Sequence, residues 1–211
     1  MKKSKRLNHY IRLACLTGAL FCYSASAFAE VLPNTQLPQG GKWILGGSGT
    51  VGSTVGNSMT ITQNAKNAVI KWDKGFNIGS IASVEFKYND KDSFNILNYD
   101  AGGQMSQIRG TLKAENGNVF IVNPAGVFIG NSAQVDVGSL YVSNKKLDDV
   151  TLKKFDGTDK IINSQPATSA ELMSLGHINA TEVTFDGSRI VLDTELLTTG
   201  GLEHPMEAKN I

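Results

Sequence analysis

The side chains that could do chemistry in this chain are few and far apart. Past residue 29 there are two histidines, His177 and His204, and no cysteine. A zinc site needs closely spaced His, Cys or carboxylate ligands, and neither histidine has such neighbours. No Gly-x-Ser-x-Gly segment is present to place a serine nucleophile between a strand and a helix. We therefore predict no catalytic residue, no metal site and no cofactor, and we expect His177 on the outer face of a strand.

Carboxylates are more numerous, but their spacing matches no known site. The following aspartates lack the spacing of a calcium loop: Asp73, Asp90, Asp92 and Asp136. The glycine-rich run at 46–52 has no Lys-Ser/Thr pair to close a phosphate loop, so we interpret it as a turn. Glu85 and Asp136 are residue types with which β-helical polysaccharide lyases and glycosidases act. Nothing in the sequence brings these two together, and this enzymatic alternative stays open.

Residues 1–29 have the three parts of a secretory signal peptide. Basic residues precede an apolar run at 13–23, and Ala27 and Ala29 form a small-residue cleavage pattern before Glu30. The apolar run has about half of the ~20 residues that a membrane span needs. Both cysteines of the chain lie in this segment, and neither is preceded by the residues of a lipoprotein signal. We predict cleavage after residue 29 and one domain over 30–211.

Composition narrows the class of the remaining chain. The sequence is 41% hydrophobic and 18% charged, which is too apolar for a disordered protein. Its formal charge of +1 comes from the signal segment, because 15 basic side chains stand against 19 acidic ones past residue 29. A mildly acidic domain has no electrostatic reason to attract nucleic acid or anionic lipid. We therefore expect no nucleic-acid partner.

The elements that must position any site are short β-strands. No window sustains a 3.6-residue apolar period over three turns, whereas two-residue alternation recurs in short runs bounded by Gly, Asn or Asp. The runs lie at 59–61, 69–72, 84–88, 94–96, 108–112, 119–121, 127–129, 135–137, 140–142, 178–185 and 190–192. Strands this short, with turns this frequent, favour a parallel β-helix over a sandwich or barrel.

A polar interval interrupts the strand pattern at 147–171. Lys and Asp side chains crowd there with few apolar ones, so we predict a solvated loop or small hairpin outside the coils. A loop that contacts a receptor is the functional alternative. A short helix at Ser169–Leu175 is an alternative for the end of this segment.

The segment 95–140 carries a spaced motif. It contains Ile96-Leu97-Asn98, then Ser106-Gln107-Ile108-Arg109-Gly110, and then Asn123-Pro124-Ala125-Gly126-Val127. These residues resemble the amino-terminal secretion domain of two-partner secretion exoproteins, the family of filamentous haemagglutinin and the high-molecular-weight adhesins. The resemblance covers about residues 40–142. It implies an all-β fold, a right-handed parallel β-helix with a few hairpins or loops outside it.

The corner of this motif, Asn123-Pro124-Ala125-Gly126, has good turn chemistry. Asn can bond its own backbone two residues on, Pro presets φ, and Gly suits the fourth position. Ala125 stands where the family has a central Asn, and the family's N-P-N-L run is absent, which points to the adhesin-like branch. A corner between two strands is enough to explain these residues, and a role in recognition is compatible with it.

The resemblance implies a route and a partner rather than a reaction. In that family, periplasmic domains of an outer-membrane transporter recognise the secretion domain and pass it to the surface or medium of a Gram-negative-type cell. The residues that it implicates in recognition, or in the fold that recognition needs, are Asn98, Ser106, Ile108, Gly110, Asn123, Pro124, Ala125, Gly126 and Val127. We expect a segment within 95–127 to add an edge strand to the transporter. The implied role of the secreted chain is that of an adhesin with a host glycan or protein as receptor.

Overall fold

The computed structural model describes residues 32–88, 92–193 and 195–197. The predicted signal peptide, Asp90 and His204 lie outside these ranges. Within them, no helix has the length and apolar character that crossing a membrane requires.

Short strands make up most of the described chain. They are β1 Gly41–Leu45, β2 Ser53–Val55, β3 Ser58–Gln63, β4 Asn67–Trp72, β5 Ser83–Tyr88, β6 Phe94–Asp100, β7 Ser106–Ile108, β8 Thr111–Val122, β9 Val127–Ile129, β10 Gln134–Ser143, β11 Glu171–Ser174, β12 His177–Asn179, β13 Glu182–Asp186, β14 Arg189–Leu192 and β15 Glu195–Leu197. The two helices are α1 Asp149–Leu152 and α2 Lys160–Asn163. The alternative of a helix at Ser169–Leu175 is wrong, because β11 lies there and buries every second side chain.

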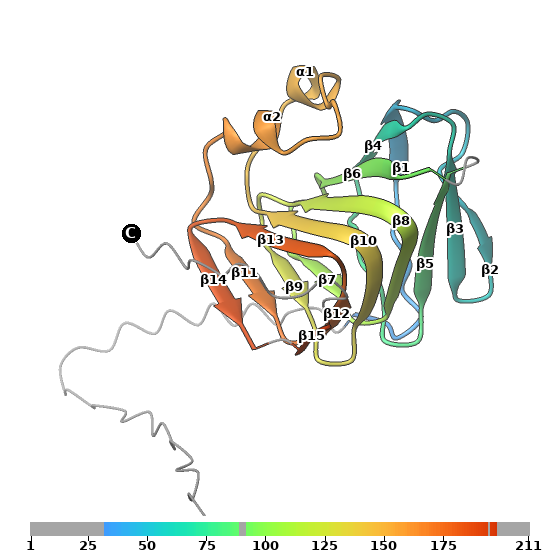
Figure 1. The fold of residues 1–211 in the computed structure, drawn as a ribbon. Coiled ribbons are helices and arrows are strands. Elements are labelled where there is room, and N and C mark those ends of the chain that lie inside the picture. The colour runs from blue at the N-terminus through green and yellow to red at the C-terminus, as the bar shows by residue number, and fades with distance from the viewer. Residues whose placement is uncertain (1–31, 89–91, 194, 198–211) are drawn as a thin grey trace, which may run out of the picture. The chain divides into compact units, whose positions relative to one another are not determined.

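The strands wind into a stack of parallel coils (Figure 1). In one sheet β7, β9, β11 and β14 lie side by side, each in parallel register with the strand of the next coil. In the other sheet β4, β6, β8 and β10 follow one another in the same way, and β12 and β13 continue from β10. The predicted parallel β-helix is therefore confirmed. The first strands depart from it, since β1 pairs antiparallel with β4, and β2 antiparallel with β3.

Alternate side chains of each strand fill the inside of the coils. In β9, Val127 and Ile129 are fully buried, whereas Phe128 between them is half-buried. Inward residues of successive coils lie in register, so that Ile108, Ile129 and Ser174 form one column. Each of these side chains is covered by the coils on both sides of it, which makes neighbouring coils depend on each other.

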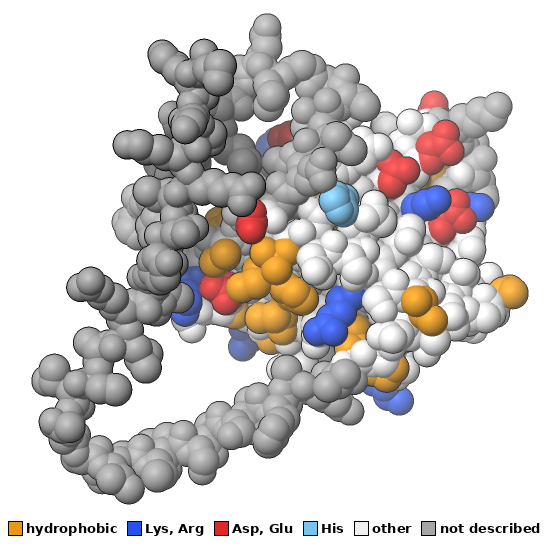
Figure 2. Space-filling view, turned by 90° about the horizontal axis from the view of Figure 1, so that it is seen from below, with side chains coloured by type: hydrophobic (Ala, Val, Ile, Leu, Met, Phe, Trp, Pro, Cys, Tyr) orange, Lys and Arg blue, Asp and Glu red, His pale blue; other side chains and the backbone are white. Residues whose placement is uncertain are grey.

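β14 ends the four-stranded sheet among the described strands. Its residues Ile190 and Leu192 lie in register with the buried Leu172 and Ser174, yet both are exposed, as is Val191. This exposure arises because no described strand pairs with the far edge of β14. In Figure 2, hydrophobic side chains gather over one part of the lower face.

Residues 147–166 leave the coils after β10 and carry both helices, which lie against the outer side of the stack (Figure 1). The prediction of a solvated excursion is wrong in one respect, because four apolar side chains of this segment are buried, although Val150 is exposed. Leu147, Leu152, Phe155 and Ile162 join a second apolar cluster with outward-facing residues of the strands, among them Val69, Leu97, Tyr99, Phe120, Val122 and Tyr141. The rings of Phe155 and Phe120 meet edge to face, with centroids 5.1 Å apart.

A polar network around the buried Tyr141 and Lys145 ties this excursion to two coils. The Tyr141 hydroxyl of β10 lies 2.6 Å from Asp186 Oδ2 and 2.7 Å from Asn163 Oδ1. Lys145 Nζ lies 2.8 Å from the same Asp186 oxygen and donates to Asn163 O at 3.0 Å. Burial of the phenol, followed by its bond to Asp186, raises the pKa of Tyr141. One residue of α2 and one of β13 are thus held by the same tyrosine.

Replacing Tyr141 with Phe tests this network. We expect Tyr141→Phe to lose about 1–2 kcal/mol of unfolding free energy at neutral pH, because the single O–H of the buried phenol no longer donates to the carboxylate of Asp186. Since the folded-state pKa of Tyr141 is raised, its contribution is present below the ordinary tyrosine pKa of about 10 and is lost as the pH rises above it. Urea unfolding at neutral and alkaline pH measures both effects. Tyr88→Phe, at a half-buried tyrosine outside the network, is the control, and an equal loss in both variants would contradict the assignment.

For two buried serines of the four-stranded sheet, we predict that replacement with alanine changes the free energy of unfolding in opposite directions. Ser174 is fully buried, and its Oγ has no hydrogen-bond partner among the described residues. Ser174→Ala should therefore raise the free energy of unfolding by about 1 kcal/mol. Ser106 is equally buried, but its hydroxyl donates to Asp100 Oδ2 at 2.6 Å. Ser106→Ala should lower the same free energy by about 2 kcal/mol. Urea unfolding of the two variants measures the signs, and a shift in the same direction for both would contradict this account.

Candidate functional site

The predicted motif corner joins β8 to β9 and is held by Asn123. The Asn123 side chain accepts a hydrogen bond from Ala125 N at 2.7 Å. It also donates to Gln104 O at 2.8 Å and lies 2.9 Å from Ser106 Oγ. The carbonyl of Asn123 accepts from Gly126 N at 2.9 Å and closes the turn. Gly126 has a φ of 100°, and a Cβ there would lie 2.5 Å from a backbone oxygen of the next coil, so glycine is required. The predicted turn chemistry is confirmed.

Asp100, which the sequence analysis did not single out, orders the same corner from the preceding coil. It is 1% exposed. Its Oδ2 accepts hydrogen bonds from Ser106 Oγ at 2.6 Å and from Phe76 N at 2.8 Å. Its Oδ1 accepts from Gly102 N at 2.8 Å. Ser106 therefore connects Asp100 to Asn123, because its hydroxyl donates to the carboxylate and accepts from the amide.

Asp100, Asn123 and Asn144 occupy equivalent places in successive coils. Each directly follows a residue of one register column, formed by Tyr99, Val122 and Ser143. The Asn144 amide donates to Ala170 O at 2.7 Å and to Thr168 O at 3.2 Å, and so holds the chain where it returns from the excursion. A signal for this column exists in the sequence, because in each coil an Asp or Asn directly follows the apolar alternation.

The remaining motif residues serve the inside of the coils. Asn98 is fully buried in β6, where its Oδ1 accepts the indole N–H of Trp72 at 3.1 Å. Ile108 is fully buried in the inward column of β7. Gly110 follows it, and a Cβ there would lie 2.2 Å from Gly79 O. Packing thus explains these motif residues. Gly110 has no room for a side chain, Asn98 has a buried indole to bond, and Ile108 fills a place in the core.

The folded domain offers little of this motif to a partner. Pro124 and Ala125 are half-buried, and all the other implicated residues are buried. The folded chain also leaves no room for the expected edge contact, which stays a prediction for a chain that has not folded. β6 and β8 are paired on both sides, and the free side of β7 is taken by a parallel bridge between Ile78 and Ile108. In the folded state, no open strand edge exists within the described residues of the segment 95–127.

The residues considered for catalysis or metal binding are not brought together. Glu85 of β5 and Asp136 of β10 both lie in register with Lys113 of β8, which stands between the two carboxylates. Asp136 accepts a hydrogen bond from Asn179 at 3.0 Å. His177 begins β12 and is half-buried. Within the described ranges, no group of three or more His, Cys, Asp or Glu side chains could hold a metal ion.

Comparison with known proteins places this geometry in a family. The family model of the TPS secretion domain matches residues 29–192. A heme/hemopexin-binding protein of Haemophilus influenzae is 33% identical over 187 residues, which are 85% of this chain and 20% of that protein. A second heme/hemopexin-binding protein of Haemophilus influenzae is 34% identical over 128 residues, or 61% of this chain and 13% of that protein. The chain thus spans a fifth or less of the length of these relatives.

A solved structure shares the fold. The secretion domain of HMW1 from Haemophilus influenzae superposes with a TM-score of 0.58 at 26% sequence identity, over 72% of this chain and 40% of that one. Exoproteins with this domain are secreted across the outer membrane of Gram-negative bacteria. From the family match over residues 29–192 and the fold shared with a solved secretion domain, we conclude that the chain belongs to the TPS secretion domains of two-partner secretion exoproteins.

Proposed function

We propose that the periplasmic domains of a partner outer-membrane transporter bind this chain before its coils form, through the segment 95–127. Membership of the TPS family supports a transporter as the partner. The burial of the motif supports an extended chain as the form that is recognised.

Burial of the motif is the observation that carries the proposal. A partner cannot reach the side chains of Asn98, Ser106 or Asn123 unless the coils that cover them open. Opening them breaks the hydrogen bonds of the corner and exposes the inward columns. Recognition that uses these side chains therefore requires a chain that has not folded. The lack of cysteine past residue 29 fits this state, since no disulfide has to be avoided or broken during passage.

An extended segment also regains the edge that the folded domain lacks. Before β6, β7 and β8 pair with their neighbours, their main-chain N–H and C=O groups are free to add a strand to a receptor sheet. Main-chain bonds then supply affinity, and the alternate side chains of the segment supply specificity. Once the chain has crossed the membrane, the same groups pair with adjacent coils, and the burial of apolar side chains makes re-entry unfavourable.

We propose an adhesive role for the exoprotein at the cell surface or in the medium, with a host glycan or protein as receptor. The resemblance to adhesin secretion domains and the superposition on HMW1 support this role. Binding of heme or hemopexin is the second candidate, and the 33% identical relative of that name favours it. Both roles concern the whole exoprotein rather than the secretion domain alone.

Matched variants separate recognition from folding. Asn123→Ala removes the side-chain bonds of the corner and should cost about 2–3 kcal/mol of unfolding free energy. Leu172→Ala, at a fully buried core position of β11 outside the segment 95–127, should cost about 2–5 kcal/mol. If the motif is read in the extended chain, Asn123→Ala reduces the secreted fraction several-fold more than Leu172→Ala does. The measurement is the secreted fraction in cells that contain the partner transporter, beside urea unfolding of each purified variant.

A peptide of residues 95–127 provides the direct test. We expect it to compete with the unfolded full chain for the isolated periplasmic domains, and its Asn123→Ala form to compete more weakly. Competition by the folded chain at equal strength would contradict recognition before folding. Equal export of Asn123→Ala and Leu172→Ala at equal loss of stability would show that only the fold matters.

A further inference from the structure

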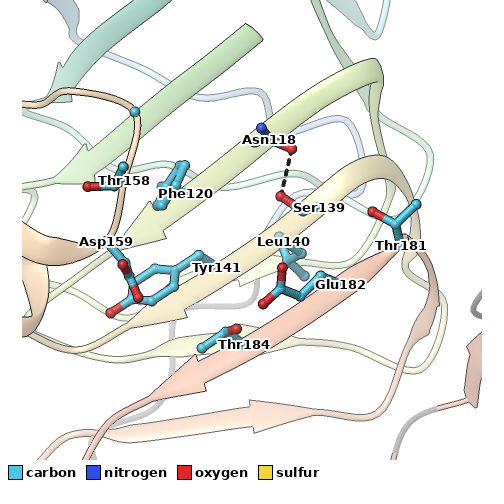
Figure 3. A pocket seen from close by; sticks show the side chains of 11 residues that line it. Asn118, Phe120, Ser139, Leu140, Tyr141, Thr158, Asp159, Thr181, Glu182 and Thr184 are labelled. Atoms are coloured by element: carbon cyan, nitrogen blue, oxygen red, sulfur yellow. Dashed lines mark hydrogen bonds between the residues drawn. The ribbon is translucent and has the colours of Figure 1, made fainter. Parts of the chain in front are cut away.

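The outer face of the coils contains a cavity that the export proposal does not use. It has a volume of about 320 Å³ and lies between β8, β10 and β13 on one side and the excursion on the other (Figure 3). The strands contribute Asn118, Phe120, Ser139, Tyr141, Glu182 and Thr184, and the excursion contributes Gly157, Thr158 and Asp159. The excursion thereby turns an otherwise open sheet surface into a site with a wall.

Two side-chain columns form the floor of this cavity. Asn118, Ser139 and Glu182 lie in register across three coils and make a polar column. Phe120, Tyr141 and Thr184 make the adjacent column in the same register. Adjacent parallel strands are about 4.8 Å apart, so each column presents side chains at regular, short intervals along the stack. A ligand that lies along the columns meets polar groups on one side and ring edges on the other.

The wall and floor are held in place by their own hydrogen bonds. Ser139 Oγ donates to Asn118 Oδ1 at 2.8 Å (Figure 3). In the excursion, Asp159 Oδ2 accepts from Asn163 at 2.8 Å, and Thr158 Oγ1 donates to Asp156 at 2.7 Å. These bonds fix the side chains before a ligand arrives, which lowers the entropy that binding has to overcome.

Other polar groups of the cavity can still accept or donate hydrogen bonds. The Glu182 carboxylate is exposed and has no hydrogen bond or ion pair within the part of the chain that the structure describes. Only one carboxylate oxygen of Asp159 has a hydrogen-bond partner among the described residues, and the Thr184 hydroxyl faces the cavity beside Tyr141 (Figure 3). Carboxylates only accept hydrogen bonds, and the bonds that they accept are about twice as strong as neutral ones. The site therefore calls for a ligand rich in donors.

Charge restricts the ligand further. Asp159 and Glu182 line the cavity, and no Lys or Arg is among the residues that line it. Phosphate, sulfate and carboxylate groups would be repelled there. A neutral molecule with several hydroxyls on an apolar ring frame satisfies both columns, since its hydroxyls donate to the carboxylates and its C–H groups contact the edges of Phe120 and Tyr141.

We propose that this cavity binds a neutral saccharide, with Glu182 and Asp159 as acceptors for its hydroxyls. Because the cavity is open and its acceptors are few, the affinity of a single sugar unit is low. Its contribution grows when several copies of the chain on one surface bind together. The source of the saccharide is either a host cell surface or a bacterial envelope, since both present neutral sugars.

Titration of the full chain with soluble oligosaccharides tests the site. One arm uses N-acetyllactosamine as an animal-type sugar, and the other uses oligomers of N-acetylglucosamine as a bacterial-envelope type. Sialyllactose and calcium chloride are the charged probes. We expect saturable binding of a neutral sugar in calorimetry or NMR, and the arm that binds identifies the source. Glu182→Gln should weaken it about tenfold through loss of charge-assisted bonds. Thr184→Arg should abolish it, because a long side chain then occupies the cavity.

Glu85→Gln is the matched control, because Glu85 is a strand carboxylate outside the cavity. Thermal unfolding verifies that every variant is folded. The proposal is overturned if neither neutral sugar binds, or if Glu182→Gln and Glu85→Gln weaken binding equally. Tighter binding of sialyllactose than of N-acetyllactosamine also overturns it, as does a response to calcium chloride without binding of either neutral sugar.

Discussion

The hydrogen-bonded chain from Asp100 through Ser106 to Asn123 is the interaction on which the centre of this domain depends. It runs across two coils at the point where each strand must turn, and all three residues are buried. In a parallel coil the turns have to repeat in register, or the inward columns above and below would not meet. A buried carboxylate and a buried amide that share one serine set the turns of two coils at once. The apolar columns can then close without voids.

This arrangement explains why one short motif can appear both structural and functional. The main-chain groups and motif side chains that would bind a transporter in the extended chain are paired or buried in the folded coils. Under the proposed recognition of the extended chain, folding removes the signal, and a domain that has left the cell no longer competes for the transporter. The proposal thus accounts for the direction of transport without a separate switch, because the bound form and the folded form exclude each other.

Much of the fold could be predicted from the sequence, because the coils obey local rules. Alternation in runs such as 127–129 indicated both the strands and their inward faces, and Asn123-Pro124-Ala125-Gly126 indicated the corner. Asp100 was missed, because an acidic residue after a strand looks like an ordinary exposed turn residue until the neighbouring coil covers it. The excursion was misjudged for a related reason. Its many charges are real, but Leu152, Phe155 and Ile162 are spaced to cover outward-facing Leu97 and Phe120. The local sign of this cover lies in the strands, because an unbroken apolar run such as 119–122 indicates a strand that is buried on both faces.

Side chains on the outer surface can be suited to a ligand, whereas those of the inner columns cannot. Inside the coils, the residue at each position is dictated by its neighbours, so little freedom remains for a ligand to be selected. Outside, the column of Asn118, Ser139 and Glu182 is not needed to fill a core. Residues 147–166 nevertheless border this part of the face, and hydrogen bonds among Asn163, Tyr141 and Lys145 hold them there. A wall that served only to cover apolar surface could lie flat over Leu97 and Phe120. The loop at Gly157–Asp159 instead stands beside the strands and leaves a hollow with unused acceptors, which is the arrangement that a binding site needs and a cover does not.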